Sequence, residues 1–428
     1  MINTYLRLGF KWSVAMLPLI FPLYFIRFEV AGFPFTLLEL ATYVLFLFFI
    51  YFELLAYERE KNEWRVFKSF VRYLLNKHGG SYFNNVGIPV VLLLVGATIG
   101  VFVAGDMQSA LGIYKGWIVA PMLYFIMWSN VNDDKFFLRR SIQFYFLSSF
   151  VLAVIALIQV KTGWYLTLDQ RASGPFESAN YLAMYIAPAF AALTVLLIKK
   201  YLKKIKRVGA EIWFLIIEMV AVGLALYFAQ SYSAILAVVV AIFAYFLFRY
   251  GSALLNYWRR ILVTLLIVIS VIVGAIYIGQ GDTYKFKDFL EFDQQSSSSV
   301  RLQVWRVATD FIAQSPIVGI GLGQYELLYA EHAAEILNQE PYEKTMLHAH
   351  SLYLSFWLYT GFVGLFALAW LIMSCFVRLK YCEKDMRPYM RLGLVMLVVI
   401  LVHGVFDTTF WKNDLAYIFW FAVALSRA

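Results

Sequence analysis

The sequence predicts an all-α polytopic membrane protein with about twelve transmembrane helices and one large outer loop. The 428 residues are 62% hydrophobic, whereas soluble domains are about 45–50% apolar. Apolar runs recur along the chain, and about 20 helical residues are enough to cross about 30 Å of hydrocarbon. Lysine and arginine are concentrated between alternate runs, as expected for a polytopic chain.

We interpret twelve apolar runs as membrane-spanning helices. They cover residues 9–26, 36–56, 86–104, 113–130, 141–160, 179–198, 211–229, 231–248, 261–279, 351–374, 389–406 and 413–427. The first run follows Arg7 and Lys11 but lacks a small-residue cleavage site. We therefore expect a retained helix rather than a removed signal peptide.

The positive charges predict the orientation. With twelve spans and the amino terminus inside, the cytoplasmic segments hold 26 lysines and arginines and the outer segments hold 10. This split follows the positive-inside rule, so the net charge of +9 reflects orientation rather than nucleic-acid binding. Both termini are then inside, and Cys375 and Cys382 lie at the cytoplasmic side, where no disulfide is expected.

The spans divide the chain into three predicted parts. Residues 1–279 form a membrane domain with spans 1 to 9, residues 280–350 form a large periplasmic loop with amphipathic helices, and residues 351–428 form a membrane domain with spans 10 to 12. Residues 57–85 read as a basic cytoplasmic connector. The run Ser296-Ser-Ser-Ser299 predicts a flexible hinge within the outer loop.

The helix expected after that hinge has one arginine on each face. At 100° per residue, Arg301 falls within the arc of apolar side chains, whereas Arg306 points to solvent. A buried arginine must meet an anion or carbonyl oxygens, since an unpaired charge is costly to bury. The alternatives are snorkelling to the membrane interface or pairing with a structural carboxylate. Pro316 and the glycines that follow it predict the end of the helix and tight turns.

Two histidines stand just before a predicted membrane helix. His348 and His350 form a His-x-His pattern without nearby carboxylates at a spacing that would favour a metal site. A neutral imidazole at this boundary is well placed to accept a proton. The alternative is a pair of interfacial histidines that only form hydrogen bonds.

A second outer loop carries Arg171-Ala-Ser-Gly-Pro-Phe-Glu-Ser178-Ala-Asn180 and leads directly into a span. Ser178 can cap that helix, and free amides at a helix amino terminus favour an anion. Arginines in two separate outer loops suit a pyrophosphate, because the guanidinium fork binds phosphate oxygens bidentately.

These motifs together resemble the O-antigen ligase family, which also includes O-antigen polymerases and bacterial protein O-oligosaccharyltransferases. The resemblance runs from about residue 160 to the carboxyl end. The motifs that carry it are the Arg171…Asn180 loop, Arg301-x-x-x-Trp305 with Ser-Pro-x-x-Gly-x-Gly, His350-Ser-Leu-Tyr-Leu with Gly361-x-x-Gly364, and His403-x-x-x-Asp407.

The resemblance implies a class C glycosyltransferase fold and an activity. The family transfers a glycan from undecaprenyl pyrophosphate to an acceptor hydroxyl at the periplasmic face of the bacterial inner membrane, with inversion and without a metal or other cofactor. Its essential histidine matches His350, and its essential loop arginine matches Arg301. Arg171, His348, Asn180 and Ser231 are the further substrate-binding candidates.

One motif departs from the family pattern. An arginine usually follows the serine in the loop near residue 230, whereas this chain reads Gln230-Ser-Tyr-Ser233. Arg171 would then have to supply the missing phosphate contact.

The expected partners are the lipid-linked glycan donor, membrane lipids and an acceptor, either lipid A core or a growing glycan. We expect O-antigen ligation to lipid A core, with an O-antigen or exopolysaccharide polymerase as the alternative. Two other classes stay open: a metal-dependent class C enzyme, for which Glu29 or Asp106 could serve, and a flippase or transporter, for which Glu218 is the clear polar residue within a span.

Overall fold

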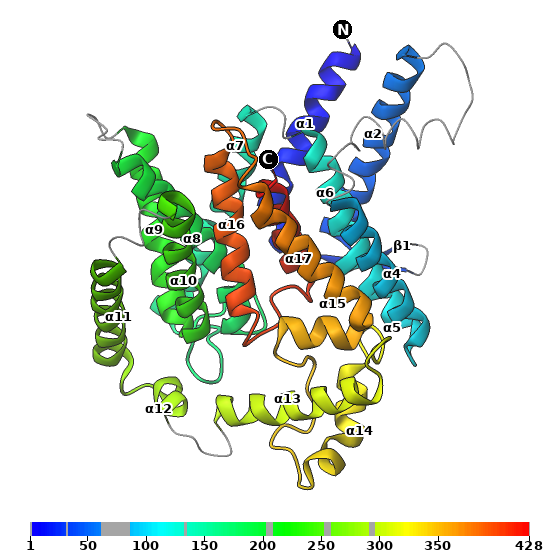
Figure 1. The fold of residues 1–428 in the computed structure, drawn as a ribbon. Helices are drawn as coiled ribbons and strands as arrows, with labels where there is room; N and C mark the ends of the chain where they lie inside the picture. Colours follow the sequence, from blue (N-terminus) through cyan, green and yellow to red (C-terminus); the bar gives the residue numbers. More distant parts are fainter. Residues whose placement is uncertain are drawn as a thin grey trace.

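The computed structural model describes residues 2–30, 33–60, 86–131, 135–202, 209–251, 258–290 and 296–427, and its architecture is mostly helical (Figure 1). Residues 61–85 of the predicted basic connector lie outside the described residues. The longer helices are α1 (Ile2–Ile20), α2 (Leu37–Glu60), α4 (Ile88–Val103), α6 (Ala120–Val131), α7 (Lys135–Thr162), α8 (Ala179–Leu202), α9 (Ala210–Ala229), α10 (Tyr232–Tyr250), α11 (Trp258–Gln280), α13 (Ser297–Gln314), α14 (Tyr325–Leu337), α15 (Leu352–Arg378), α16 (Arg387–His403) and α17 (Asn413–Leu425). Short helices are η1 (Phe21–Phe25), α5 (Met107–Ile113), η3 (Tyr114–Val119) and α12 (Tyr284–Leu290).

Each of the twelve predicted runs overlaps one or more of these helices. Among the described residues, eight helical segments are long and apolar enough to cross a membrane: Tyr5–Phe25, Leu37–Leu55, Met107–Ser129, Lys135–Thr162, Ala179–Lys199, Ala210–Ala229, Tyr232–Tyr250 and Leu352–Arg378. The chain is therefore a multi-pass membrane protein, and the count of twelve stays a prediction. The 13-residue helix α17 shows why a run can mislead, because all its residues are buried. Its apolar side chains fill the protein core.

The mostly helical architecture also contains one short β-hairpin, between η1 and α2. Strands β1 (Arg27–Val30) and β2 (Phe33–Thr36) pair antiparallel, with Arg27 opposite Thr36 and Phe28 opposite Phe35. Phenylalanine, valine and threonine suit the extended backbone of such a hairpin. Its strands have four residues each, too few for the apolar-run criterion to detect.

Helices α4 and α15 pack with their backbones in close approach. A Cβ atom on Gly100 would lie 2.1 Å from the carbonyl oxygen of Tyr359, so only glycine fits there. This is the small-residue packing that membrane helices use. The adjoining glycine-rich loop is fixed to both helices, since Ile320 N–H donates to Leu358 O (2.8 Å) and Leu322 N–H donates to Gly100 O (2.9 Å). Gly361, with φ of 65°, breaks α15 where that loop rests on it.

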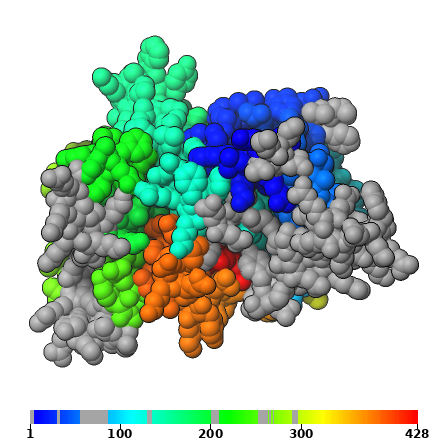
Figure 2. Space-filling view, turned by 90° about the horizontal axis from the view of Figure 1, so that it is seen from above, coloured from blue at the N-terminus to red at the C-terminus, as the bar shows by residue number. Residues whose placement is uncertain are grey.

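Helices α12, α13 and α14 lie together at the end of the molecule opposite the amino terminus (Figure 1). Figure 2 shows the molecule from above, at the end that lies opposite helices α12 to α14. This face shows blue, cyan, green and orange segments and almost none of the yellow ones. The large loop is thus a layer of helices at one end of the bundle.

The predicted hinge at Ser296 to Ser299 is wrong. The Ser296 side chain accepts a hydrogen bond from Ser299 N–H (3.2 Å) and caps α13, which begins at Ser297. Serine is a favoured cap residue because its oxygen satisfies a free amide of the first turn. The run of serines is therefore a helix start, and it fixes the direction of α13.

The predicted faces of α13 are confirmed. Val304, Val307 and Phe311 are buried, Arg301 is half-buried, and Arg306 is exposed. The helix ends at Gln314, just before Pro316, as predicted.

Candidate functional site

The His350 side chain pairs with the buried carboxylate of Asp407, which lies between α16 and α17. Its Nδ1 lies 3.2 Å from Oδ1 of Asp407, with the Asp407 side chain 5% exposed and the His350 side chain 32% exposed. Asp407 Oδ1 also accepts a hydrogen bond from Thr408 N–H (2.9 Å). The imidazole therefore has one nitrogen turned to the carboxylate, which leaves Nε2 to face an incoming group.

The acidity of Asp407 follows from these contacts. Burial alone would raise its pKa, but the hydrogen bond from His350 and the positive charges of His350 and Arg301 outweigh burial and hold the pKa of Asp407 below its usual value. Asp407 is therefore ionised at neutral pH, and it can stabilise a proton on His350.

The backbone at His350 is strained. Its φ of 44° lies in the left-handed region, which residues other than glycine seldom adopt. Trp305 Nε1–H donates to His350 O (3.3 Å), which fixes this turn against α13. Strain of this kind persists where surrounding contacts hold it, and it is concentrated at functional sites.

Arg301 is anchored beside this pair. Its Nε–H donates to Phe406 O (3.1 Å), one residue before Asp407, and Nη1–H donates to Ser297 O (3.3 Å). Among the described residues, no group accepts a hydrogen bond from its Nη2. The arginine thus meets carbonyl oxygens, as the helical projection required, and keeps donors for an anion near His350.

His348 faces away from that carboxylate. Its Nδ1 lies 3.4 Å from the Tyr359 hydroxyl, and its ring contacts that of Trp117 edge-on, with 6.3 Å between centroids. Burial, aided by the charge of Lys412, lowers the pKa of His348 to about 4. It is therefore neutral at neutral pH and lies toward a different set of side chains from His350.

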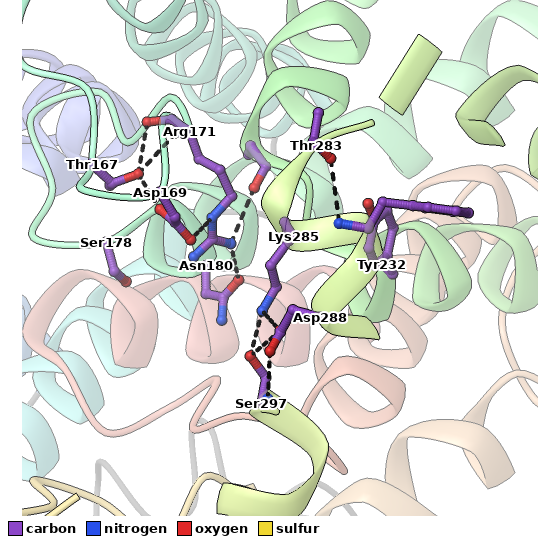
Figure 3. Close-up of polar contacts among 12 residues, drawn as sticks. Thr167, Asp169, Arg171, Ser178, Asn180, Tyr232, Thr283, Lys285, Asp288 and Ser297 are labelled. Atoms are coloured by element: carbon purple, nitrogen blue, oxygen red, sulfur yellow. Dashed lines mark hydrogen bonds and ion pairs between the residues drawn. The ribbon is translucent and has the colours of Figure 1, made fainter. Parts of the chain in front are cut away.

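Arg171 is committed largely to its own loop (Figure 3). Its Nε–H donates to Asp169 Oδ2 (2.6 Å), and Nη1 donates to Asn180 Oδ1 (3.2 Å) and Ala229 O (3.4 Å). The side chain is 10% exposed. Asn180 therefore orients Arg171, whose Nη2 alone has no acceptor among the described residues. The predicted cap is confirmed, since Ser178 Oγ accepts from Tyr181 N–H (3.2 Å).

Ser231 lies in the turn between α9 and α10, and it is buried. The next residue, Tyr232, donates from its hydroxyl to Gln280 Oε1 (3.1 Å) at the end of α11. Position 232, directly after Ser231, therefore carries an aromatic side chain rather than a cation.

A pocket of about 280 Å³ lies beside Trp117, the residue whose ring contacts that of His348. Its walls come from segments that are distant in sequence, and they include Tyr24, Phe35, Glu39, Lys115, Trp117, Glu177, Lys412 and Asn413. Two ion pairs cross it, Lys115 with Glu39 at 3.1 Å and Lys412 with Glu177 at 2.8 Å. The hydrogen bond from Lys412 holds the pKa of Glu177 below its usual value. Aromatic rings beside charged groups make a surface suited to a polar, ring-shaped ligand.

Residues 217–369 match the family model described as O-Antigen ligase. Over this segment, the chain is similar to the O-antigen ligase family. A search of curated proteins finds no match for the chain. The family implies an enzyme of the glycosyltransferase type. The matched segment contains Ser231, Arg301, His348 and His350.

Three residues of this candidate site were not assigned a role from the sequence. Asp407, the partner of His350, follows the matched segment, and Asp169, the partner of Arg171, precedes it. Lys285 lies within it, in α12. The sequence signal that could have identified them is that each lies between two predicted spans, on the predicted outer side.

The acidic residues considered for a metal-dependent enzyme lie elsewhere. Asp106 accepts a hydrogen bond from Ser109 N–H (3.1 Å) and caps α5. Glu29 lies in β1, opposite Pro34. Glu218, the residue considered for transport, is buried within α9.

Proposed function

We propose that this protein transfers a glycan from undecaprenyl pyrophosphate to an acceptor hydroxyl, with inversion and without a metal. The observation that carries the proposal is the His350–Asp407 pair beside Arg301, with 3.2 Å between Nδ1 and the carboxylate. A base and a cation side by side are what this reaction needs, because the sugar pyrophosphate is already activated.

In the proposed step, His350 is the general base. Nδ1–H is held by Asp407, so Nε2 takes the proton of the acceptor hydroxyl as its oxygen attacks the anomeric carbon. The bond from that carbon to the pyrophosphate oxygen breaks, and the electron pair leaves with the lipid pyrophosphate. Arg301 stabilises that charge, and Arg171 contributes to the stabilisation through its Nη2. Asp407 stabilises the imidazolium until the proton is released.

The acceptor occupies the pocket beside Trp117 in this proposal. The His348 ring contacts that of Trp117, which lines the pocket, and His348 is neutral, so it can exchange hydrogen bonds with sugar hydroxyls. This arrangement gives His348 a role in binding and His350 a role in chemistry.

We assign the reaction to O-antigen ligation onto lipid A core, at the periplasmic face of the bacterial inner membrane. An O-antigen or exopolysaccharide polymerase, with a growing glycan as acceptor, is the alternative within the family. The glycan phenotype of a deletion strain separates the two. Loss of polymer from lipid A core indicates ligation, and loss of chain length on that core indicates polymerisation.

The mechanism is tested with purified protein, lipid-linked glycan and acceptor, with and without EDTA. We expect transfer to survive EDTA and to fall by a factor on the order of 10² or more in His350→Ala, because the general base is lost. His348→Ala should lose less. Near-normal transfer in His350→Ala with an inactive His348→Ala would reverse the two roles. Normal transfer in both variants would end the histidine mechanism.

A further inference from the structure

Lys285 is a lysine largely withdrawn from solvent in the short helix α12. Its Nζ lies 3.0 Å from Asp288 Oδ2 and also donates to the Ser297 hydroxyl. The side chains of Lys285 and Asp288 are 14% and 7% exposed. Figure 3 shows Lys285, Asp288 and Ser297 in the same close-up as Arg171 and Asn180. A shielded ammonium group is costly unless it is paired and hydrogen-bonded, and Asp288 and Ser297 supply these contacts to Lys285.

Lys285 and Arg301 both donate hydrogen bonds to Ser297. Ser297, the first residue of α13, accepts from Lys285 through its hydroxyl and from Arg301 through its carbonyl (3.3 Å). Burial lowers the pKa of Lys285, and the charges of Arg171 and Arg301 lower it further, against the opposing effect of Asp288. The three cations are therefore near enough for each guanidinium to act on the ammonium group.

Asp288 accepts hydrogen bonds from donors that could also bind a phosphate oxygen. Its carboxylate accepts from Ser297 N–H (3.2 Å), from the Ser297 hydroxyl (2.7 Å) and from Lys285. Burial would raise the pKa of Asp288, but these bonds outweigh burial and hold the pKa below its usual value. An internal anion thus lies among an ammonium group, a hydroxyl and a backbone amide.

We propose that Lys285 is a phosphate ligand, which binds the lipid pyrophosphate together with Arg301 after the pyrophosphate displaces the Asp288 carboxylate. This inference rests on the proposed function, since it needs a pyrophosphate-bearing donor. The charges support it, because Arg171, Lys285 and Arg301 are balanced by three carboxylates, Asp169, Asp288 and Asp407. Displacement of Asp288 leaves an excess of positive charge for a phosphate to neutralise. Since Tyr232 supplies no cation in the neighbouring turn, Lys285 provides one from α12.

The test measures binding of undecaprenyl pyrophosphate, without a glycan, to the purified full-length chain. Lys285→Ala should weaken binding at least about tenfold, the scale of one lost charge-assisted contact. Lys287→Ala is the matched control, since this lysine lies on the same helix but is exposed, and its binding should not change. Arg301→Ala should weaken binding as well.

Asp288→Asn separates a ligand from a structural lysine. If Lys285 binds phosphate, Asp288→Asn should bind as tightly as the wild type or more tightly, because the competing carboxylate is gone. Equal weakening in Lys285→Ala and Asp288→Asn would overturn the proposal, since Lys285 would then act only through its ion pair. Where Lys285→Ala does not fold, the double variant Lys285→Met with Asp288→Asn leaves no buried charge and is compared with Asp288→Asn alone. It should bind about tenfold more weakly.

The outcomes also distinguish this inference from the proposed function. Unchanged binding in Lys285→Ala, with weakened binding in Arg301→Ala, would overturn the role of Lys285 and keep the pyrophosphate site. No binding of undecaprenyl pyrophosphate to the wild type would contradict the proposed function itself.

Discussion

Arg301 and Arg306 lie on one helix with the same charge and opposite surroundings. Arg301 is half-buried and bonded to Phe406 O, whereas Arg306 is exposed. We expect Arg301→Ala to lose roughly 2–4 kcal/mol of transition-state stabilisation, the scale of one lost electrostatic contact to developing charge. Arg306→Ala should stay close to the wild type. Transfer rates at saturating donor make the comparison, and equal damage from both variants would show that the wrong face of α13 was assigned to the substrate.

His348 gives the folded protein a pH dependence whose sign can be derived. Its pKa is about 4 in the folded state and about 6.5 in an unfolded chain. Between these values the unfolded chain binds a proton that the folded chain does not, so stability falls as the pH drops from 6.5 toward 4. Below about 4, this residue causes no further loss.

The thermal midpoint of the purified protein, measured at pH 7 and pH 5, tests this dependence. His348→Asn should reduce the difference between the two midpoints, because the titrating group is gone. His332→Asn is the control, since His332 is a half-exposed histidine of α14. An unchanged difference in His348→Asn would show that other groups cause the acid sensitivity.

Sequence and structure agree best where a single helix decides the outcome. The burial of Arg301 followed from the 100° spacing of the residues around it, which is a local property. Asp407 and Lys285 could not be assigned in the same way, because their roles depend on contacts with His350 and Ser297 that tertiary packing creates. Arg171 was predicted as a phosphate ligand, a role that stays a proposal, and its partner Asp169 lies only two residues away.

At the scale of elements, the contact between α4 and α15 fixes the loop that leads to the site. Gly100→Ala would place a methyl group against the Tyr359 carbonyl and disturb the bond from Leu322 N–H to Gly100 O. We expect a loss of roughly 1–3 kcal/mol of stability, as for other overpacked interiors. Gly274→Ala is the matched control, because it lies in helix α11 with no atom within 4 Å of the added Cβ.

Thermal unfolding in detergent measures both glycine variants. The midpoint of Gly100→Ala should fall by several degrees, whereas Gly274→Ala should match the wild type or exceed it slightly, since alanine favours a helix. Equal midpoints for Gly100→Ala and the wild type would mean that the two helices can separate without loss.

The start of α13 shows what composition misses at this scale. Four consecutive serines indicate flexibility by composition, but Ser296 caps the helix and Ser297 binds both Asp288 and Lys285. The same side chains that suit a linker also suit a helix amino terminus. Only the neighbouring residues of α12 decide between the two outcomes.

At the scale of the whole molecule, hydrophobicity predicted where helices form but not what surrounds them. Lipid and protein interior both favour apolar side chains, so a run that faces lipid and a run buried in the core look alike in sequence. Helix α17, with its residues buried, is the clear case. The hairpin β1–β2 was missed because its strands are short and lie next to a run.

The last prediction concerns orientation, which rests on the split of 26 against 10 basic residues. Single cysteines at Glu343, in the large loop, and at Lys384, between α15 and α16, test opposite sides, and both positions are exposed. The background replaces the native Cys375 and Cys382, which are buried. With a membrane-impermeant maleimide on intact spheroplasts, we expect labelling at residue 343 and none at residue 384 until the cells are lysed. The reverse pattern would place the His350–Asp407 site on the cytoplasmic side, where a periplasmic transfer reaction could not use it.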